Sequence, residues 1–137
     1  MADLITDSNV LVGSFLSEDR FHNAGLNYVN GLENGDDIFH VPMLVPVEVV
    51  AAIWRRSQKL GLALVARALK SFDDWEADGH IVLYPLDRAR MDAAMNVAVK
   101  YRFSGSDSVI VALAEELNIP LKTFDQEIQR RFTGASS

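Results

Sequence analysis

The sequence has 137 residues, of which 49% are hydrophobic, 23% are charged and 9% are aromatic. This length favours a single domain, and this composition is typical of a soluble globular protein rather than a disordered or fibrous chain. The chain carries 13 basic and 19 acidic residues, and its net charge of −6 argues against a broadly basic surface that binds nucleic acid. Acids that converge on divalent cations would be neutralised locally, so the positions of the acids matter more than their number.

The chain contains no cysteine, which excludes disulfides, zinc–thiolate sites and thiol nucleophiles and is typical of a protein from a reducing compartment. The first residues lack the basic segment of a secretory signal. No stretch approaches the roughly 20 apolar residues of a membrane helix. We therefore expect a cytoplasmic protein that does not insert into a membrane.

Short apolar runs alternate with longer helical patterns, and this order is typical of an α/β domain with a mainly parallel sheet. In chain order the predicted elements are a strand at 3–6, helices at 10–16 and 20–32, a strand at 37–41, a helix from 43–46 to Arg55, a helix at 60–78, a strand at 81–85, a helix from Asp87 to Tyr101, a helix at 107–117, a strand at 121–124 and a helix at 126–132. A short fifth strand could escape this pattern. Residues 1–133 are predicted to form one domain, followed by a short flexible tail at 134–137.

Four carboxylates occupy positions that amphipathic patterning does not explain. Asp7 follows the first predicted strand and Asp125 follows the fourth, at the carboxyl ends where open parallel sheets bind ligands. Asp107 opens a helix, and Glu48 is embedded in an otherwise apolar segment. Because the carboxyl ends of parallel strands meet at one edge of the sheet, these four acids could converge although they are far apart in the sequence.

Each acid also has a purely structural interpretation. Asp7 could end a turn or cap a helix, Asp107 suits the positive end of a helix dipole, and Asp125 could cap the last helix. Glu48 could face solvent from a helix that is buried on its other sides. As a set, however, carboxylates about 4 Å apart would repel one another by roughly 4 kcal/mol per pair at an effective dielectric constant of 20. Convergence would therefore require cations or protons.

Four segments of the chain carry a family resemblance, and in order they read ITDSNVLV, VEVV, SDSVIVALA and LKTFD. Their order and spacing resemble the successive motifs of the PIN-domain ribonucleases, which include the VapC-type toxins of prokaryotic toxin-antitoxin modules. The resemblance spans nearly the whole chain and implies a three-layer α/β/α sandwich, in which the four matching acids bind Mg²⁺ or Mn²⁺ and RNA is cleaved. It also implies a homodimer and a small antitoxin that blocks the site. Ser8 and Ser108 depart from the Thr and Ala usual in the family, but neither departure removes a carboxylate.

Carboxylates without cysteine or paired histidines favour Mg²⁺ or Mn²⁺ over zinc, so all four acids are candidate catalytic residues and metal ligands. Asn9 and Thr123 are candidates for holding these carboxylates in place. Arg55 and Lys59 lie near the helical face of Glu48 and could contact RNA phosphates, although a solvated polar face explains them as well.

These residues predict a Mg²⁺- or Mn²⁺-dependent endoribonuclease that hydrolyses RNA phosphodiester bonds, as the toxin of a toxin-antitoxin module. Attack by water would leave a 5′-phosphate and a 3′-hydroxyl. Two alternatives remain open. A catalytically silent module of the same fold would bind a protein partner, whereas an aspartyl-phosphate protein would be phosphorylated on Asp7. The sequence disfavours the second alternative because it lacks both adjacent early acids and an acid at Asn9.

Overall fold

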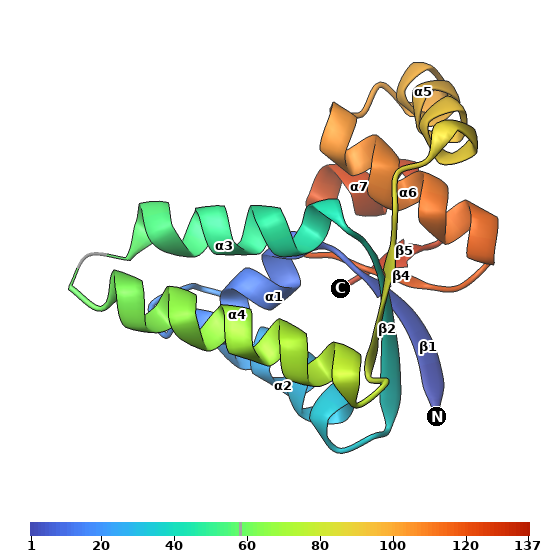
Figure 1. Ribbon diagram of the computed structural model, residues 1–137. Helices are drawn as coiled ribbons and strands as arrows, with labels where there is room; N and C mark the ends of the chain where they lie inside the picture. The colour runs from blue at the N-terminus through green and yellow to red at the C-terminus, as the bar shows by residue number, and fades with distance from the viewer. Residues whose placement is uncertain (58) are drawn as a thin grey trace.

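The computed structural model describes residues 1–57 and 59–137. Its strands are β1 (Ala2–Thr6), β2 (Asp37–Pro42), β3 (Ile81–Tyr84), β4 (Leu121–Lys122) and β5 (Ala135–Ser136). Its helices are α1 (Ser8–Phe15), α2 (His22–Glu33), α3 (Leu44–Arg56), α4 (Gly61–Ala77), α5 (Arg88–Tyr101), α6 (Gly105–Leu117) and α7 (Gln126–Arg131). All strand pairs are parallel, in the order β3-β2-β1-β4-β5. Helices α1 to α4 lie on one side of the sheet and α5 to α7 on the other, which confirms the α/β/α sandwich (Figure 1).

The predicted strands and helices are present, with ends that differ by a few residues. Helix α1 begins at Ser8, earlier than predicted, because the carboxylate of Asp7 caps it and accepts the Ser8 backbone N–H at 2.7 Å. Strand β4 ends at Lys122, earlier than predicted, because the next residues leave the ladder. The backbone N–H of Phe124 donates instead to Asn9 Oδ1 at 3.2 Å. Both differences arise from contacts of residues at the candidate site.

Residues 134–137, predicted as a short flexible tail, contain the edge strand β5. The backbone N–H of Leu121 donates to the carbonyl of Gly134 at 3.0 Å, and that of Thr123 donates to the carbonyl of Ser136 at 3.0 Å. The tail prediction missed this pairing because a strand of two small residues has neither an apolar alternation nor β-branched side chains.

Strand β1 lies inside the sheet, between β2 and β4. Ile5 of β1, Phe39 of β2 and Leu121 of β4 are fully buried and form the centre of the core. Since β1 leads along the chain to β2 on one side and is joined by β4 on the other, a crevice for ligands is expected at the carboxyl end of β1. Among the described helices, none has the length and apolarity of a membrane-spanning segment.

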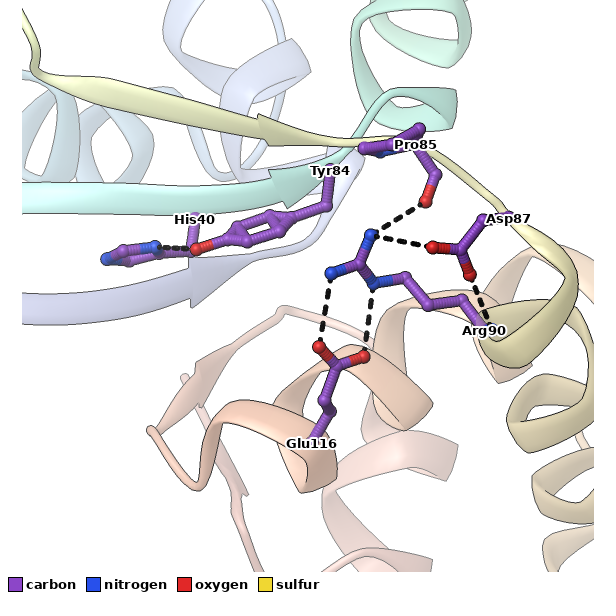
Figure 2. Close-up of polar contacts among 6 residues, drawn as sticks. All are labelled: His40, Tyr84, Pro85, Asp87, Arg90 and Glu116. Carbon is purple, nitrogen blue, oxygen red and sulfur yellow. Dashed lines mark hydrogen bonds and ion pairs between the residues drawn. The ribbon is translucent and has the colours of Figure 1, made fainter.

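A network of polar side chains joins β3 to helices α5 and α6 (Figure 2). Two guanidinium nitrogens of Arg90 donate to the two carboxylate oxygens of Glu116, at 3.1 and 3.2 Å, and a third donates to the carbonyl of Pro85 at 3.1 Å. The same guanidinium lies 5.1 Å from the ring centroid of Tyr84, whose hydroxyl is 2.8 Å from His40 Nδ1. The two-pronged ion pair between Arg90 and Glu116 joins α5 to the C-terminal end of α6, and the bond to Pro85 joins α5 to the segment after β3.

Candidate functional site

The four predicted acids act on one another at the carboxyl edge of the sheet. Burial is the main cause of a raised pKa at Asp7, and repulsion from Asp107 and Glu48 adds to it. Burial likewise raises the pKa of Glu48, with a further contribution from Asp107, and it raises the pKa of Asp107, with a further contribution from Asp125. The hydroxyl of Thr123 also links the Asp7 carboxylate to the backbone of Asp125, so the four residues lie at one edge of the sheet and within reach of a neighbour's charge. We call them the acid cluster.

Asp7 is the most deeply buried member of the acid cluster, with 4% of its surface exposed. Its Oδ1 accepts the backbone N–H of Ser8 at 2.7 Å, and its Oδ2 accepts the hydroxyl of Thr123 at 2.7 Å. Both hydrogen bonds favour the ionised carboxylate, but burial outweighs them and raises the pKa of Asp7 to about 6. Asp7 therefore caps α1, as the sequence suggested, although burial disfavours its ionised form.

Glu48 lies in α3 and is half-buried. Its Oε1 is buried and, among the described residues, has no hydrogen-bond partner. Burial raises the pKa of Glu48, while the nearby hydroxyls of Ser106 and Ser8 lower it. A solvent-facing position accounts for only part of this environment, because a buried carboxylate oxygen without a partner costs free energy. The position therefore favours a proton or a cation beside Glu48.

Asp107 and Asp125 occupy the starts of two helices. Asp107 is the third residue of α6, and its backbone N–H donates to the hydroxyl of Ser104, the N-cap, at 3.3 Å. Asp125 caps α7, since its Oδ1 accepts the N–H groups of Glu127 and Ile128 at 2.8 and 3.3 Å. This confirms the structural interpretation of Asp125. Its Oδ2 accepts no hydrogen bond within the described chain, so one oxygen of Asp125 is left for a ligand.

Thr123 and Asn9 connect the members of the acid cluster. The buried hydroxyl of Thr123 donates to Asp7 and accepts the backbone N–H of Asp125 at 3.0 Å. The side-chain amide of Asn9 also donates to this hydroxyl, at 3.4 Å. Asn9 Oδ1 in turn accepts the N–H of Phe124. Thr123 and Asp125 both lie beyond the end of β4, so they do not share a face of that strand. The hydroxyl of Thr123 reaches the backbone of Asp125 instead.

Several residues around the acid cluster were missed from the sequence. Ser104 caps α6, the hydroxyls of Ser8 and Ser106 lie near Glu48, and Gln129 Nε2 donates to the carbonyl of Thr123 at 2.8 Å. The spacing of Ser104 and the acid three residues later resembles a capping box and could have shown the cap. The contact of Gln129 depends on how α7 packs, which no local pattern indicates.

The donor atoms of the acid cluster fit a hard divalent cation. They are carboxylate oxygens, which Mg²⁺ and Mn²⁺ prefer. Within residues 1–57 and 59–137, no three acidic or imidazole side chains lie close enough together to enclose an ion by themselves. Mg²⁺ usually keeps several waters and binds only one or two carboxylates directly, so this wider spacing still suits it. The buried oxygen of Glu48, which has no hydrogen-bond partner in the described part of the chain, supports the same fit.

We expect Thr123→Val to weaken both the fold and cation binding. The substitution removes the donor to Asp7 and the acceptor for Asp125, and leaving a buried polar group without a partner costs about 1 to 3 kcal/mol. Loss of a group that orients metal ligands lowers metal affinity about 10- to 100-fold. Urea unfolding and calorimetric Mn²⁺ titration measure the two effects. Thr123→Ser keeps the hydroxyl and should retain both properties, whereas unchanged Mn²⁺ affinity in Thr123→Val would contradict this role.

Arg55, Arg56 and Lys59 lie at or just after the end of α3, and two of them line hollows on the surface. Arg55 is exposed and forms no ion pair among the described residues, while Lys59 lines a hollow of about 490 Å³ that also includes Arg56. Arg56, which the sequence did not single out, also lines a second hollow with Ser8 and Asn9, beside the acid cluster. Arg56, and not Arg55, therefore shares this hollow with Ser8 and Asn9.

Comparisons with known proteins agree on the architecture. VapC20 of Mycobacterium tuberculosis, described as a Sarcin-Ricin loop cleaving toxin, matches with a TM-score of 0.74 and 12% identity over 93% of both chains. A chain of a toxin-antitoxin complex from Klebsiella pneumoniae matches with a TM-score of 0.70 and 13% identity, over 98% of this chain and 96% of that chain. PAE2754 of Pyrobaculum aerophilum matches with a TM-score of 0.70 and 19% identity, over 98% and 88% of the two chains.

These structural matches, at such low identity, show the fold alone. No curated protein matches the sequence significantly. The model of the PIN domain family, however, matches residues 4–132, which is nearly the whole chain. This protein therefore belongs to the PIN domain family.

Proposed function

We propose that this PIN-domain protein is a divalent-metal-dependent endoribonuclease. The acid cluster carries the proposal, because it gathers carboxylates from separate segments and three of them are held at an electrostatic cost. The pKa values of Asp7, Glu48 and Asp107 are all raised, mainly by burial. Groups with such perturbed pKa values are concentrated at catalytic sites. A cation at the cluster would relieve the repulsion and place positive charge where a phosphodiester binds.

The residues of the site have separate tasks in this mechanism. Asp7, Glu48, Asp107 and Asp125 would hold Mg²⁺ or Mn²⁺, which lowers the pKa of the attacking water and stabilises charge on the phosphoryl oxygens. Thr123 keeps Asp7 oriented before the substrate binds, which limits reorganisation during the reaction. Water adds to phosphorus as the bond to the 3′-oxygen breaks, and that oxygen takes up a proton. The products therefore carry a 5′-phosphate and a 3′-hydroxyl.

The chemistry of the product ends tests this proposal. A short single-stranded RNA incubated with the protein and Mn²⁺ should yield 5′-phosphate and 3′-hydroxyl ends by mass spectrometry, and excess chelator should stop cleavage. Glu48→Gln, purified in the same way, controls for contaminating nucleases and should be inactive. Ends that carry 2′,3′-cyclic phosphate would contradict the mechanism, because they arise from attack by the RNA's own 2′-hydroxyl. Absence of cleavage across varied RNAs would favour the catalytically silent interaction module.

We also infer that the protein is the cytoplasmic toxin of a toxin-antitoxin module, forms a homodimer and is blocked by a small antitoxin. The toxin-antitoxin complex from Klebsiella pneumoniae, of similar fold, supports this assignment. A groove of about 680 Å³ between α3 and α4 supports a protein partner, because its lining includes the exposed apolar side chains of Val47, Trp54, Leu62 and Leu69. Arg55 and Lys59 stay predictions as contacts to RNA phosphates.

A further inference from the structure

A hollow of about 370 Å³ lies beside the acid cluster, and its volume falls in the range of about 300 to 1,000 Å³ that is usual for small-molecule sites. Helices α1 and α3 lie close together (Figure 1). Residues of both helices line the hollow. Ser8 and Asn9 line it on the side of the acid cluster, and Arg20, Phe21 and Arg56 also line it. The hollow therefore brings two arginines from distant segments next to the residues proposed for catalysis.

Asp19 holds Arg56 in place within this hollow. One oxygen of Asp19 lies 2.8 Å from a terminal nitrogen of Arg56, and the other accepts the backbone N–H of Phe21 at 2.8 Å. The Asp19 side chain is only 11% exposed, whereas that of Arg56 is 46% exposed. Among the described residues Arg56 makes no other polar contact. Because a guanidinium has five N–H donors in a planar fork, those that do not face Asp19 can bind a phosphate.

Arg20 lies over the ring of Phe21, which in turn stacks on Phe124, a residue next to the acid cluster. Phe124 lies between Thr123 and Asp125 in the sequence, and its ring stacks on that of Phe21 with centroids 4.5 Å apart and planes at 20°. The guanidinium carbon of Arg20 lies 4.7 Å from the centroid of the Phe21 ring. Arg20 is exposed and forms no ion pair among the described residues. A planar guanidinium in this position presents a surface on which an unpaired nucleobase can stack.

The charges of the hollow suit a phosphodiester. Asp19 and Arg56 cancel one another, so Arg20 leaves one positive charge in the hollow. This charge stands out in a chain whose net charge is −6. A strand whose scissile phosphate lies at the acid cluster would place its neighbouring nucleotide in the hollow, where both a phosphate ligand and a stacking surface are present.

We propose that the hollow is a binding subsite for one nucleotide next to the scissile phosphate of single-stranded RNA. Arg56 binds the phosphate of this nucleotide, and Arg20 stacks on its base. A single strand is favoured over a duplex because bases paired within a helix cannot stack on a protein side chain. The inference rests on the proposed nuclease function and adds to it the position and residues of substrate binding.

RNA binding by matched variants tests the subsite. Fluorescence anisotropy with a labelled single-stranded RNA and Mg²⁺ gives the affinity, with Asp7→Asn present in every protein to prevent cleavage. Arg20→Ala and Arg56→Ala should each weaken binding about fivefold to tenfold, and Arg56→Ala should lower the salt slope by about one. Arg20→Lys keeps the charge but not the planar group, so it should keep the salt slope and lose part of the affinity. Arg67→Ala removes an exposed arginine of α4 outside the hollow and should bind like the parent.

The outcomes separate the subsite from the proposed function. If the wild-type protein cleaves RNA while Arg20→Ala and Arg56→Ala keep their affinity and KM, the subsite is wrong and the nuclease proposal stands. If the wild-type protein cleaves nothing, yet both substitutions weaken RNA binding and Arg67→Ala does not, the hollow still binds a nucleotide but the nuclease proposal fails. When the RNA is shortened stepwise from either end, one of the shortened RNAs should lack the nucleotide that occupies the hollow. The Asp7→Asn parent and its Arg20→Ala variant should bind that RNA with equal affinity. If Arg20→Ala and Arg56→Ala weakened the binding of duplex RNA as much as the binding of single-stranded RNA, the assignment to single strands would be wrong.

Discussion

Asp7→Asn should lower the rate of RNA cleavage by at least about a thousandfold, which corresponds to about 4 kcal/mol of lost transition-state stabilisation. The substitution removes the most buried charge of the acid cluster, and with it a ligand proposed for Mg²⁺ or Mn²⁺. Asparagine still offers an oxygen to the N–H of Ser8, so the cap of α1 should remain and the protein should fold. The loss should therefore reflect chemistry rather than unfolding.

Asp92→Asn provides the matched control for this experiment. Asp92 is an exposed acid of α5 that pairs with Arg88 at 3.3 Å, so the same chemical change occurs outside the acid cluster. Single-turnover cleavage of labelled RNA at saturating Mn²⁺ should be unchanged in Asp92→Asn. Calorimetric titration should show Mn²⁺ binding in the wild type and in Asp92→Asn, and much weaker binding in Asp7→Asn. Full activity of Asp7→Asn would contradict a role for the acid cluster in RNA cleavage.

Without divalent ions, the free energy of unfolding should fall as the pH rises from about 4 to about 6. The pKa of Asp7 is raised from 3.8 to about 6 in the folded protein, mainly by burial. Between these values the folded state keeps a proton that the unfolded state has released, so a higher pH favours unfolding. The shift in the pKa of Asp7 lowers the free energy of unfolding by about 3 kcal/mol in total. This decrease is complete at pH values above the pKa of Asp7 in the folded protein. Glu48 and Asp107, whose pKa values are also raised, act in the same direction.

Urea unfolding at a series of pH values in chelator measures this effect. Subtracting the curve of Asp7→Asn from that of the wild type isolates Asp7 from the other acids, and the difference should change sharply across this window. Mg²⁺ or Mn²⁺ should restore the stability of the wild type at neutral pH, because the ion binds the folded, ionised acid cluster. A difference curve that is flat, or that favours the wild type as the pH rises, would contradict the environment described for Asp7.

The sequence was sufficient for the parts of the fold that depend on local pattern. The order of strands and helices follows from short apolar runs and helical spacing, and the acids at their ends follow from that order. The contacts of these acids were predictable in part. The sequence offered helix caps for Asp7 and Asp125 and named Thr123 as a residue that holds a carboxylate, and the structure has both caps and a hydrogen bond from Thr123 to Asp7. Which carboxylate Thr123 reaches depends on the pairing of β1 with β4, which no local pattern indicates.

The choice between Arg55 and Arg56 shows a further limit of helical spacing. At 3.6 residues per turn, Arg55 lies closer to Glu48 around the helix than Arg56 does, so the sequence favoured Arg55. The hollow that borders the acid cluster is completed by the segment before α2, which Asp19 attaches to Arg56. Which arginine faces the hollow is therefore decided by a tertiary contact, and helical phase alone could not reveal it.

The short strand β5 affects how variants of this protein should be designed. Its Ser136 accepts the backbone N–H of Thr123 through its carbonyl, and its hydroxyl accepts Lys122 Nζ at 2.8 Å. These bonds brace the backbone from which the hydroxyl of Thr123 reaches Asp7. Trimming the last residues, a routine step before crystallisation, would remove this brace. Inactivity of a shortened protein would then report a displaced threonine rather than a chemical role for the residues that were cut away.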